Sequence, residues 1–185
     1  QESYLHEHFI SGKDTLNYRV LWPKNFDASK RYPLMVFLHG AGERGSDNTK
    51  QLVHGGELFY NTSDTFPAIV IFPQCPQNDY WANATVDRST VPLSLNFPLF
   101  IEPTKSMTLV MALLDEMLTK SYTNTNEVYV GGLSMGGMGT FEILYRKPEV
   151  FAAAFAICGA GNPDTTEGYA KLFRCGFSMG QKMMW

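Results

Sequence analysis

The chain has 185 residues, of which 44% are apolar, 14% aromatic and 18% charged, enough for one domain with a large buried core. We therefore expect residues 1–185 to form a single domain. Glycines and prolines are scattered without a tract or a repeat, which excludes collagen-like and solenoid proteins, and the apolar content excludes a disordered chain. The net charge of -3, with Lys and Arg dispersed, offers no basic patch for nucleic acid or an anionic membrane. These features favour a small or neutral molecule as the partner.

No stretch of the sequence approaches the roughly 18 consecutive apolar residues that a membrane-spanning helix needs. The start of the chain lacks the pattern of a signal peptide, yet it begins at Gln1, as after removal of a leader or trimming of the chain. The first explanation leads us to expect a secreted or periplasmic protein. Cys75, Cys158 and Cys175 are too few and too widely spaced for a disulfide framework or a zinc site, so we expect ordinary thiols.

Short apolar runs predict the strands. We expect six of them, at Tyr4–Ile10, Leu16–Trp22, Pro33–Leu38, Ala68–Phe72, Val128–Val130 and Phe151–Ile157. Turn residues at 11–14 join the first two strands into a hairpin. The runs 33–38 and 68–72 are apolar throughout, which is typical of strands covered on both faces of a parallel sheet.

Helices are predicted between these strands. Residues 104–122 carry a helical stripe of apolar side chains, namely Met107, Val110, Met111, Leu114, Met117 and Leu118. A second helix is predicted over Met135–Arg146, and a third, weakened by Gly55, is expected after Asp47. Residues 73–98 are rich in turn formers and predict a long surface loop. The alternation indicates an α/β fold, with a mostly parallel sheet covered by helices on both faces.

A glycine-flanked serine lies between a predicted strand and a predicted helix. The residues Gly132-Leu133-Ser134-Met135-Gly136 match the pattern G-x-S-x-G, and a strand-to-helix turn is the context that this pattern requires. Because the turn is so sharp, side chains in place of Gly132 and Gly136 would collide with their neighbours. Ser134 is thereby exposed at the carboxyl end of the sheet as the predicted nucleophile, and the N–H of Met135, at a helix N-terminus, is placed to stabilise an oxyanion. A plain glycine-rich turn is the alternative.

A second glycine-rich segment, residues 39–42 (His-Gly-Ala-Gly), follows an earlier predicted strand. An oxyanion hole of this kind needs a further N–H from the loop after that strand, and Ala41 is the candidate donor. Residues 40–45 also satisfy G-x-G-x-x-G, the pattern of a dinucleotide-binding loop. That alternative is disfavoured because the next strand ends in Phe-Pro-Gln at 72–74, without an acidic residue for a ribose hydroxyl.

Together these motifs resemble those of the α/β-hydrolase esterases of the polyhydroxybutyrate-depolymerase and feruloyl-esterase type. The resemblance covers residues 16–168 and is carried by Tyr32–Leu34, Phe37–Gly45, Phe72–Pro76 with Trp81, and Gly132–Gly137. It implies a serine carboxylesterase that uses Ser134 as its nucleophile and needs neither cofactor nor metal. The substrates that it implies are acyl or cinnamoyl esters of plant polysaccharides.

Four further side chains near these motifs are candidates for a role. Tyr80 and Trp81, in the predicted loop, are candidate substrate-binding residues, with simple packing as an equally weighted alternative. Glu43 and Arg44 either fix the oxyanion loop by ion pairing or are merely solvated, and the first role is favoured.

The acid and the histidine of the expected triad are missing from their usual place. In this fold the triad runs in the order Ser, acid, His. Asp164 is the only aspartate after Ser134, and all four histidines precede that serine: His6, His8, His39 and His54. Without a base, Ser134 would be a weak nucleophile.

The tail suggests a cause for this absence. Residues 171–185 show neither a strand pattern nor a helical stripe. Read one base earlier from Leu172, permitted codons can encode Ile-Pro-Val-Trp-Val-Phe-His-Gly-Ala-Lys-Asp-Asp-Val, which resembles the strand and acid loop that the family has next. We therefore expect a frameshift, with 171–185 as an out-of-frame tail.

Such a truncation would have a physical consequence. A sheet that lacks its last strands would leave Phe151–Ile157 as an unprotected edge, through which the chain would dimerise or aggregate. Three functions stay open on the sequence: a serine carboxylesterase, a catalytically impaired truncated hydrolase, and an acyltransferase or peptidase on the same turn. The expected partner is a small-molecule or carbohydrate ester, and neither nucleic acid nor a membrane.

Overall fold

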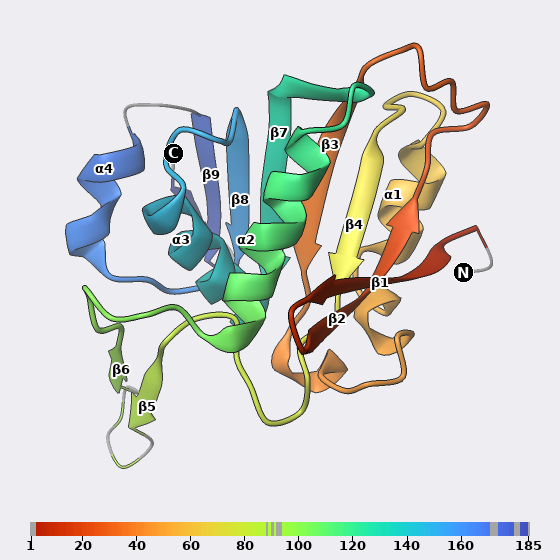
Figure 1. Cartoon of the computed structure of the whole chain (residues 1–185). Coiled ribbons are helices and arrows are strands. Elements are labelled where there is room, and N and C mark those ends of the chain that lie inside the picture. Colours follow the sequence, from red (N-terminus) through yellow and green to blue (C-terminus); the bar gives the residue numbers. More distant parts are fainter. Residues whose placement is uncertain are drawn as a thin grey trace.

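The computed structural model describes residues 3–87, 89, 91, 94–170, 174–179 and 182–184, which form an eight-stranded sheet flanked by helices and a small two-stranded sheet (Figure 1). The strands are β1 (Leu5–Ser11), β2 (Asp14–Leu21), β3 (Tyr32–Leu38), β4 (Ile69–Pro73), β5 (Thr85–Asp87), β6 (Ser94–Asn96), β7 (Thr123–Leu133), β8 (Ala153–Ile157), β9 (Arg174–Met179) and β10 (Lys182–Met184). The α-helices are α1 (Gly56–Thr62), α2 (Lys105–Leu118), α3 (Met135–Arg146) and α4 (Thr166–Ala170), and the short 3-10 helices are η1 (Ala41–Glu43), η2 (Lys50–Leu52) and η3 (Pro163–Thr165).

The large sheet has the strand order β1-β2-β4-β3-β7-β8-β9-β10. Its centre, from β4 to β9, is parallel, while β1, β2 and β10 pair antiparallel at the two ends. Because parallel strands share a direction, the segments that follow β3, β7 and β8 emerge at the same edge of the sheet. Leu38 at the end of β3 lies beside Gly132 near the end of β7, which brings the two glycine-rich motifs together.

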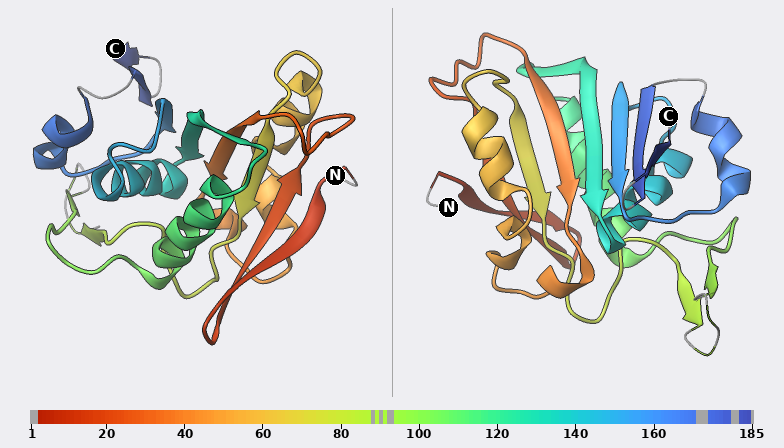
Figure 2. Two further views of the ribbon diagram at one scale, coloured as in Figure 1. Left: turned by 45° about the horizontal axis from the view of Figure 1, so that its top comes forward. Right: turned by 180° about the vertical axis from the view of Figure 1, so that it is seen from behind.

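Apolar residues cover both faces of the central strands, as their uninterrupted apolar runs predict. Helices α2 and α3 pack on one face, over Leu34, Val36, Ile71 and Val130, whereas α1 packs on the other, over Phe37 and its neighbours. Figure 2 shows this division, with α1 next to β4 on the side of the sheet away from α2 and α3. The fold is therefore the mostly parallel, helix-covered sheet that the sequence indicates.

Most predicted elements are confirmed. The hairpin, the two buried strands, the helix at Met135–Arg146 and the strand before it all form, and Thr104 caps α2 by accepting a hydrogen bond from the N–H of Met107 at 3.1 Å. The helix expected after Asp47 is instead divided into η2 and α1, because Gly55 between them has a φ of 94°. The loop predicted at 73–98 contains the short strands β5 and β6.

The C-terminal edge of the sheet differs from the prediction. Strand β8 is not an edge, because its Ala153–Ile157 pairs with Arg174–Ser178 of β9, and β10 follows beyond it. The prediction that 171–185 has no secondary structure is therefore wrong for the described part of the tail. A strand edge offers a row of free N–H and C=O groups that any extended chain can pair with, whatever its side-chain pattern. The exposed edge through which the chain was expected to dimerise or aggregate is therefore not β8, and the association itself stays a prediction.

Within the described ranges, the longest helix, α2, has 14 residues, and none is long and apolar enough to cross a membrane.

Candidate active site

Ser134 occupies the sharp turn between β7 and α3. Its backbone has φ 56° and ψ -112°, a conformation that few non-glycine residues adopt, and its side chain is exposed. The N–H of Ser134 donates to the carbonyl of Ile157 in β8 at 2.8 Å, and the carbonyl of Ser134 accepts from the N–H of Met138 at 3.0 Å. These bonds fix the strained turn on both sides, as expected for a strain held at a functional position.

The glycines around Ser134 allow backbones to meet. A Cβ on Gly132 would lie 2.2 Å from the carbonyl oxygen of Gly136, and a Cβ on Gly136 would lie 1.8 Å from that of Leu38. Gly137 likewise touches the backbone of Gly159, at 2.7 Å from the position of a Cβ. The turn therefore packs directly on the ends of β3 and β8, and no side chain fits at these positions.

Two backbone N–H groups are available beside this serine. Met135 is the first residue of α3, so its N–H has no partner within the helix and carries the positive end of the helix dipole. Ala41 is the first residue of η1, so its N–H is likewise unpaired within that turn. The start of α3 contacts the carbonyls of Leu38 and His39, which brings the loop of Ala41 next to the serine turn.

His39 is part of the scaffold of this loop. The ring is fully buried, and burial lowers the pKa of its imidazole. Its Nε2 accepts from the N–H of Cys75 at 3.0 Å, so its Nδ1 is the protonated nitrogen that donates to the carbonyl of Gly40 at 2.6 Å. Both nitrogens of a neutral ring are thus occupied, and His39 cannot serve Ser134 as a base.

The structure corrects the role expected for Trp81. This side chain is fully buried, its Nε1–H donates to the carbonyl of His39 at 3.0 Å, and its ring packs on the imidazole at 5.1 Å between centroids. Trp81 also fills the space beside Gly139 of α3. Its indole N–H satisfies a buried carbonyl, which explains why an aromatic residue in a predicted surface loop belongs to the core. Tyr80 is half-buried, and its role in binding substrate stays a prediction.

Arg44 and Glu43 do fix the loop, but by other contacts than an ion pair with each other. Arg44 donates to the carbonyls of Ala41 at 3.1 Å and Asp79 at 3.2 Å, and its guanidinium lies over the ring of Tyr80 at 5.2 Å from the centroid. The ion pair of Glu43 is with His54, at 3.6 Å from Oε1 to Nε2. Arg44 therefore joins the oxyanion loop to the chain after β4.

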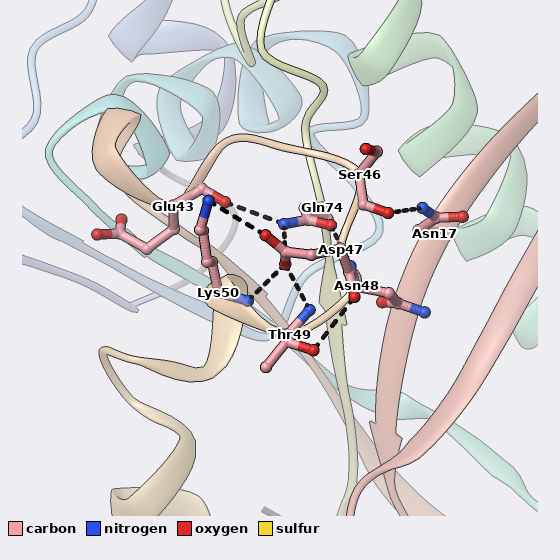
Figure 3. Close-up of polar contacts among 8 residues, drawn as sticks. All are labelled: Asn17, Glu43, Ser46, Asp47, Asn48, Thr49, Lys50 and Gln74. Atoms are coloured by element: carbon pink, nitrogen blue, oxygen red, sulfur yellow. Dashed lines mark hydrogen bonds and ion pairs between the residues drawn. The ribbon is translucent and has the colours of Figure 1, made fainter.

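A polar network that the sequence does not reveal lies below this loop, centred on Gln74 and Asp47 (Figure 3). The Nε2 of Gln74 donates to the carbonyl of Glu43 at 3.2 Å and to Oδ1 of Asp47 at 3.0 Å. That carboxylate also accepts from the N–H groups of Lys50 and Thr49, each at 2.9 Å. Above all the bond from the N–H of Lys50, followed by that from Gln74, lowers the pKa of Asp47 far below its usual range.

Within the described residues, no histidine or acid is hydrogen-bonded to Ser134. His6 and His8 lie on β1, four strands away from β7, and His54 pairs with Glu43. Asp164 lies in η3, where its N–H is bound by Asn162. The described ranges also hold no group of three or more His, Cys, Asp or Glu side chains that would suit a metal ion.

Two of the cysteines are free thiols. Cys75 is buried, and desolvation raises the pKa of its thiol to about 12, so it is inert at neutral pH. Cys158 is exposed directly after β8. The side chain of Cys175 lies outside the described part.

The amino-acid sequence is similar to those of known hydrolases. Residues 104–178, which include the serine turn, match the prolyl oligopeptidase family. Lysophospholipase-like protein 1 of Mus musculus is 28% identical over 132 residues, which cover 68% of this chain and 53% of that protein. The chain thus spans about half the length of the curated relative it matches.

Solved structures give the same fold. A thermostable esterase superposes with a TM-score of 0.79 at 32% identity, covering 94% of this chain and 45% of that one. A ferulic acid esterase from Anaeromyces mucronatus, in complex with ferulic acid, has a TM-score of 0.57 at 18% identity, covering 85% of this chain and 58% of that one. The chain has the α/β-hydrolase fold, and the proteins that resemble it in sequence include serine esterases and hydrolases.

Proposed function

We propose that this chain is the nucleophile-bearing part of a serine hydrolase that cleaves carboxylic esters. Ser134 Oγ attacks the ester carbonyl, the alcohol leaves, and an acyl-enzyme forms that water then hydrolyses. The N–H groups of Ala41 and Met135 stabilise the oxyanion of each tetrahedral intermediate.

The observation that carries this proposal is the backbone of Ser134. A non-glycine residue held at φ 56° by bonds on both sides, with an exposed hydroxyl at a helix N-terminus, has no evident purpose in packing. Support also comes from the turn's position beside the loop of Ala41 and at the start of α3, whose first N–H groups are the proposed oxyanion donors.

For the substrate, we propose acyl or cinnamoyl esters, including those attached to plant polysaccharides, and a secreted or periplasmic site of action. Support comes from the sequence motifs shared with feruloyl esterases and from the likeness to esterase structures. Tyr80, held under Arg44 beside the oxyanion loop, is the proposed aromatic contact for the acyl group.

The acid and the histidine that would activate Ser134 are proposed to have been lost through the frameshift that the shifted reading of the tail predicts, and that reading itself contains the acid loop, Lys-Asp-Asp-Val. No histidine follows Ser134 in the 185 residues. Loss of the base lowers kcat by about a million-fold in a well-characterised serine protease, so we expect hydrolysis by this chain alone to be very slow. A protein made from the gene with the shifted frame read through should hydrolyse p-nitrophenyl acetate, and the 185-residue chain should not.

Covalent labelling tests the proposal without requiring turnover. A fluorophosphonate should add once to the read-through protein, which carries the base that activates Ser134, and the adduct should lie at Ser134, as measured by intact mass and peptide mapping. Ser134→Ala should remain unlabelled, whereas Ser29→Ala, which removes an exposed hydroxyl bound to Asp27, should be labelled as the wild type is. Labelling at another residue, or none at all at high probe concentration, would contradict the proposal.

Peptide cleavage is the second candidate, favoured by the match of residues 104–178 to the prolyl oligopeptidase family. The same nucleophile and oxyanion donors serve both reactions. The read-through protein decides between them: release of p-nitrophenol from the acetate with no cleavage of proline-containing peptides supports the esterase.

A further inference from the structure

Gln74 connects two distant points of the loop that carries Ala41. It follows β4 directly, is 2% exposed, and uses both ends of its amide. Its Oε1 accepts from the N–H of Asn48 at 2.7 Å, which fixes the orientation of the amide, because an N–H can donate only to the oxygen. Its Nε2 therefore faces the carbonyl of Glu43 at 3.2 Å and Oδ1 of Asp47 at 3.0 Å.

The backbone beside Gln74 holds the same loop. The N–H of Cys75 donates to Nε2 of His39 at 3.0 Å, and the carbonyl of Cys75 accepts from the N–H of Gly45 at 3.0 Å. The N–H of Gln74 itself donates to the carbonyl of Asn17 in β2 at 2.8 Å. The amide of Gln74 is thus anchored to the sheet while it spans the loop from Glu43 to Asn48.

We propose that Gln74 is a positioning residue that holds the oxyanion donor Ala41 in place, by binding the carbonyl of Glu43 and the N–H of Asn48 from below the loop. The inference rests on the proposed function of Ser134 and Ala41. Glu43 is the last residue of η1, so a shift of its carbonyl moves the turn whose first N–H belongs to Ala41.

The chemistry of the amide makes this role testable by an isosteric change. In Gln74→Glu the acceptor for Asn48 is kept, both donors are lost, and a second carboxylate faces Asp47. At low pH the shared proton of the two carboxylates supplies a donor again. The defect should therefore shrink as the pH falls, which simple loss of packing would not produce.

Asn124→Asp is the matched control. Asn124 also donates from its amide to a carboxylate, that of Glu127 at 2.6 Å, and accepts from the N–H of Asn126 at 3.2 Å. It lies near the start of β7, at the opposite end of that strand from Ser134. The substitution creates the same charge and the same carboxylate pair far from the oxyanion loop.

Two measurements test the role of Gln74. Hydrogen–deuterium exchange in residues 43–50 should rise at least about tenfold at pH 8 in Gln74→Glu and in Gln74→Met, with no change around Ser134. Both variants lose the donor that holds the carbonyl of Glu43, and Gln74→Met also frees the N–H of Asn48. In the read-through protein, the rate of fluorophosphonate labelling of Ser134 should fall about tenfold in both variants, because misplacing one oxyanion donor costs less than the 10²–10³-fold of removing it. At pH 5.5, Gln74→Glu should recover labelling relative to wild type and Gln74→Met should not. Asn124→Asp should match wild type in both measurements.

The outcomes are distinct. Unchanged exchange in residues 43–50, or labelling as fast as in the wild type despite raised exchange, would overturn the positioning role. A defect that is equal in Gln74→Glu at both pH values would overturn it as well. Absence of labelling in the read-through protein without these substitutions would instead overturn the proposed function, while the exchange measurement still decides whether Gln74 holds the loop.

Discussion

The turn after β7 and the loop after β3 lie next to each other at the candidate site and are held by opposite means. Around Ser134 the backbone is fixed by direct contact between backbone segments, which is possible because Gly132 and Gly136 have no side chains that would collide there. The loop of Ala41 is instead fixed by side chains, such as those of Gln74 and Arg44, which donate hydrogen bonds to its carbonyls. Substitutions in the turn should therefore act by collision, and substitutions around the loop by loss of hydrogen bonds.

The largest effect is expected from Gly136→Ala. Its Cβ would lie 1.8 Å from the carbonyl oxygen of Leu38, so the turn must move away from β3. We expect a loss of about 3 kcal/mol or more in the free energy of unfolding, and labelling of Ser134 slowed more than about a hundredfold. Thermal unfolding and fluorophosphonate labelling measure the two effects.

Gly42→Ala provides the contrast, since no atom lies within 4 Å of a Cβ there. Its free energy of unfolding should stay within about 0.5 kcal/mol of the wild type. Equal losses of unfolding free energy in Gly136→Ala and Gly42→Ala would contradict this interpretation, because they would mean that the turn does not depend on close backbone contact.

Lowering the pH should reduce the free energy of unfolding by an intermediate amount, because His39 is buried in its neutral form. Burial lowers the pKa of His39 in the folded state, so the unfolded chain binds more protons once the pH falls below about 6.5. The two hydrogen bonds of the neutral ring contribute their full stability above that pH. As the pH falls from there to the pKa of His39 in the folded state, the free energy of unfolding decreases by about 1.4 kcal/mol per pH unit. Urea unfolding between pH 8 and 5 measures this slope.

His39→Gln should be less stable than the wild type at pH 8, but its stability should depend less on pH. The gap between the two proteins should therefore narrow as the pH falls. Parallel curves would show that His39 is not the group that senses acid.

A smaller loss than in Gly136→Ala is expected from Arg44→Met. The substitution keeps the apolar stem and removes the bonds to the carbonyls of Ala41 and Asp79. Both carbonyls remain near solvent, so we expect a loss of about 1 kcal/mol in unfolding free energy and labelling slowed a few-fold. Arg44→Lys should recover part of the labelling rate, since one donor returns. A larger loss than in Gly136→Ala would reverse the order of the comparison.

This contrast also explains how much could be read from the sequence. The turn of Ser134 was predictable because its requirement, glycine at 132 and 136 between a strand and a helix, is local. The anchors of the oxyanion loop come from other parts of the chain: Gln74 reaches Glu43 across 31 residues, and Trp81 reaches His39 across 42. No local pattern marks such partners, which is why the sequence alone left Trp81 open between substrate binding and simple packing.

The strand β9 was missed for a related reason. Its place is set by the edge of β8, whose Ala153–Ile157 pairs in parallel register with Arg174–Ser178 of β9, and not by any alternation in the tail. Secondary structure that is induced by a neighbouring strand leaves a weak trace in its own sequence.

The insertion of β3 between β4 and β7 has a consequence for how the chain folds during synthesis. One side of β3 can pair with β4 early, but the other side pairs with β7, where Leu34 meets Val128 roughly ninety residues later. Closing so long a loop is entropically costly and slows folding. A nascent chain therefore carries an apolar, half-paired strand until β7 leaves the ribosome, and in that interval it depends most on chaperones.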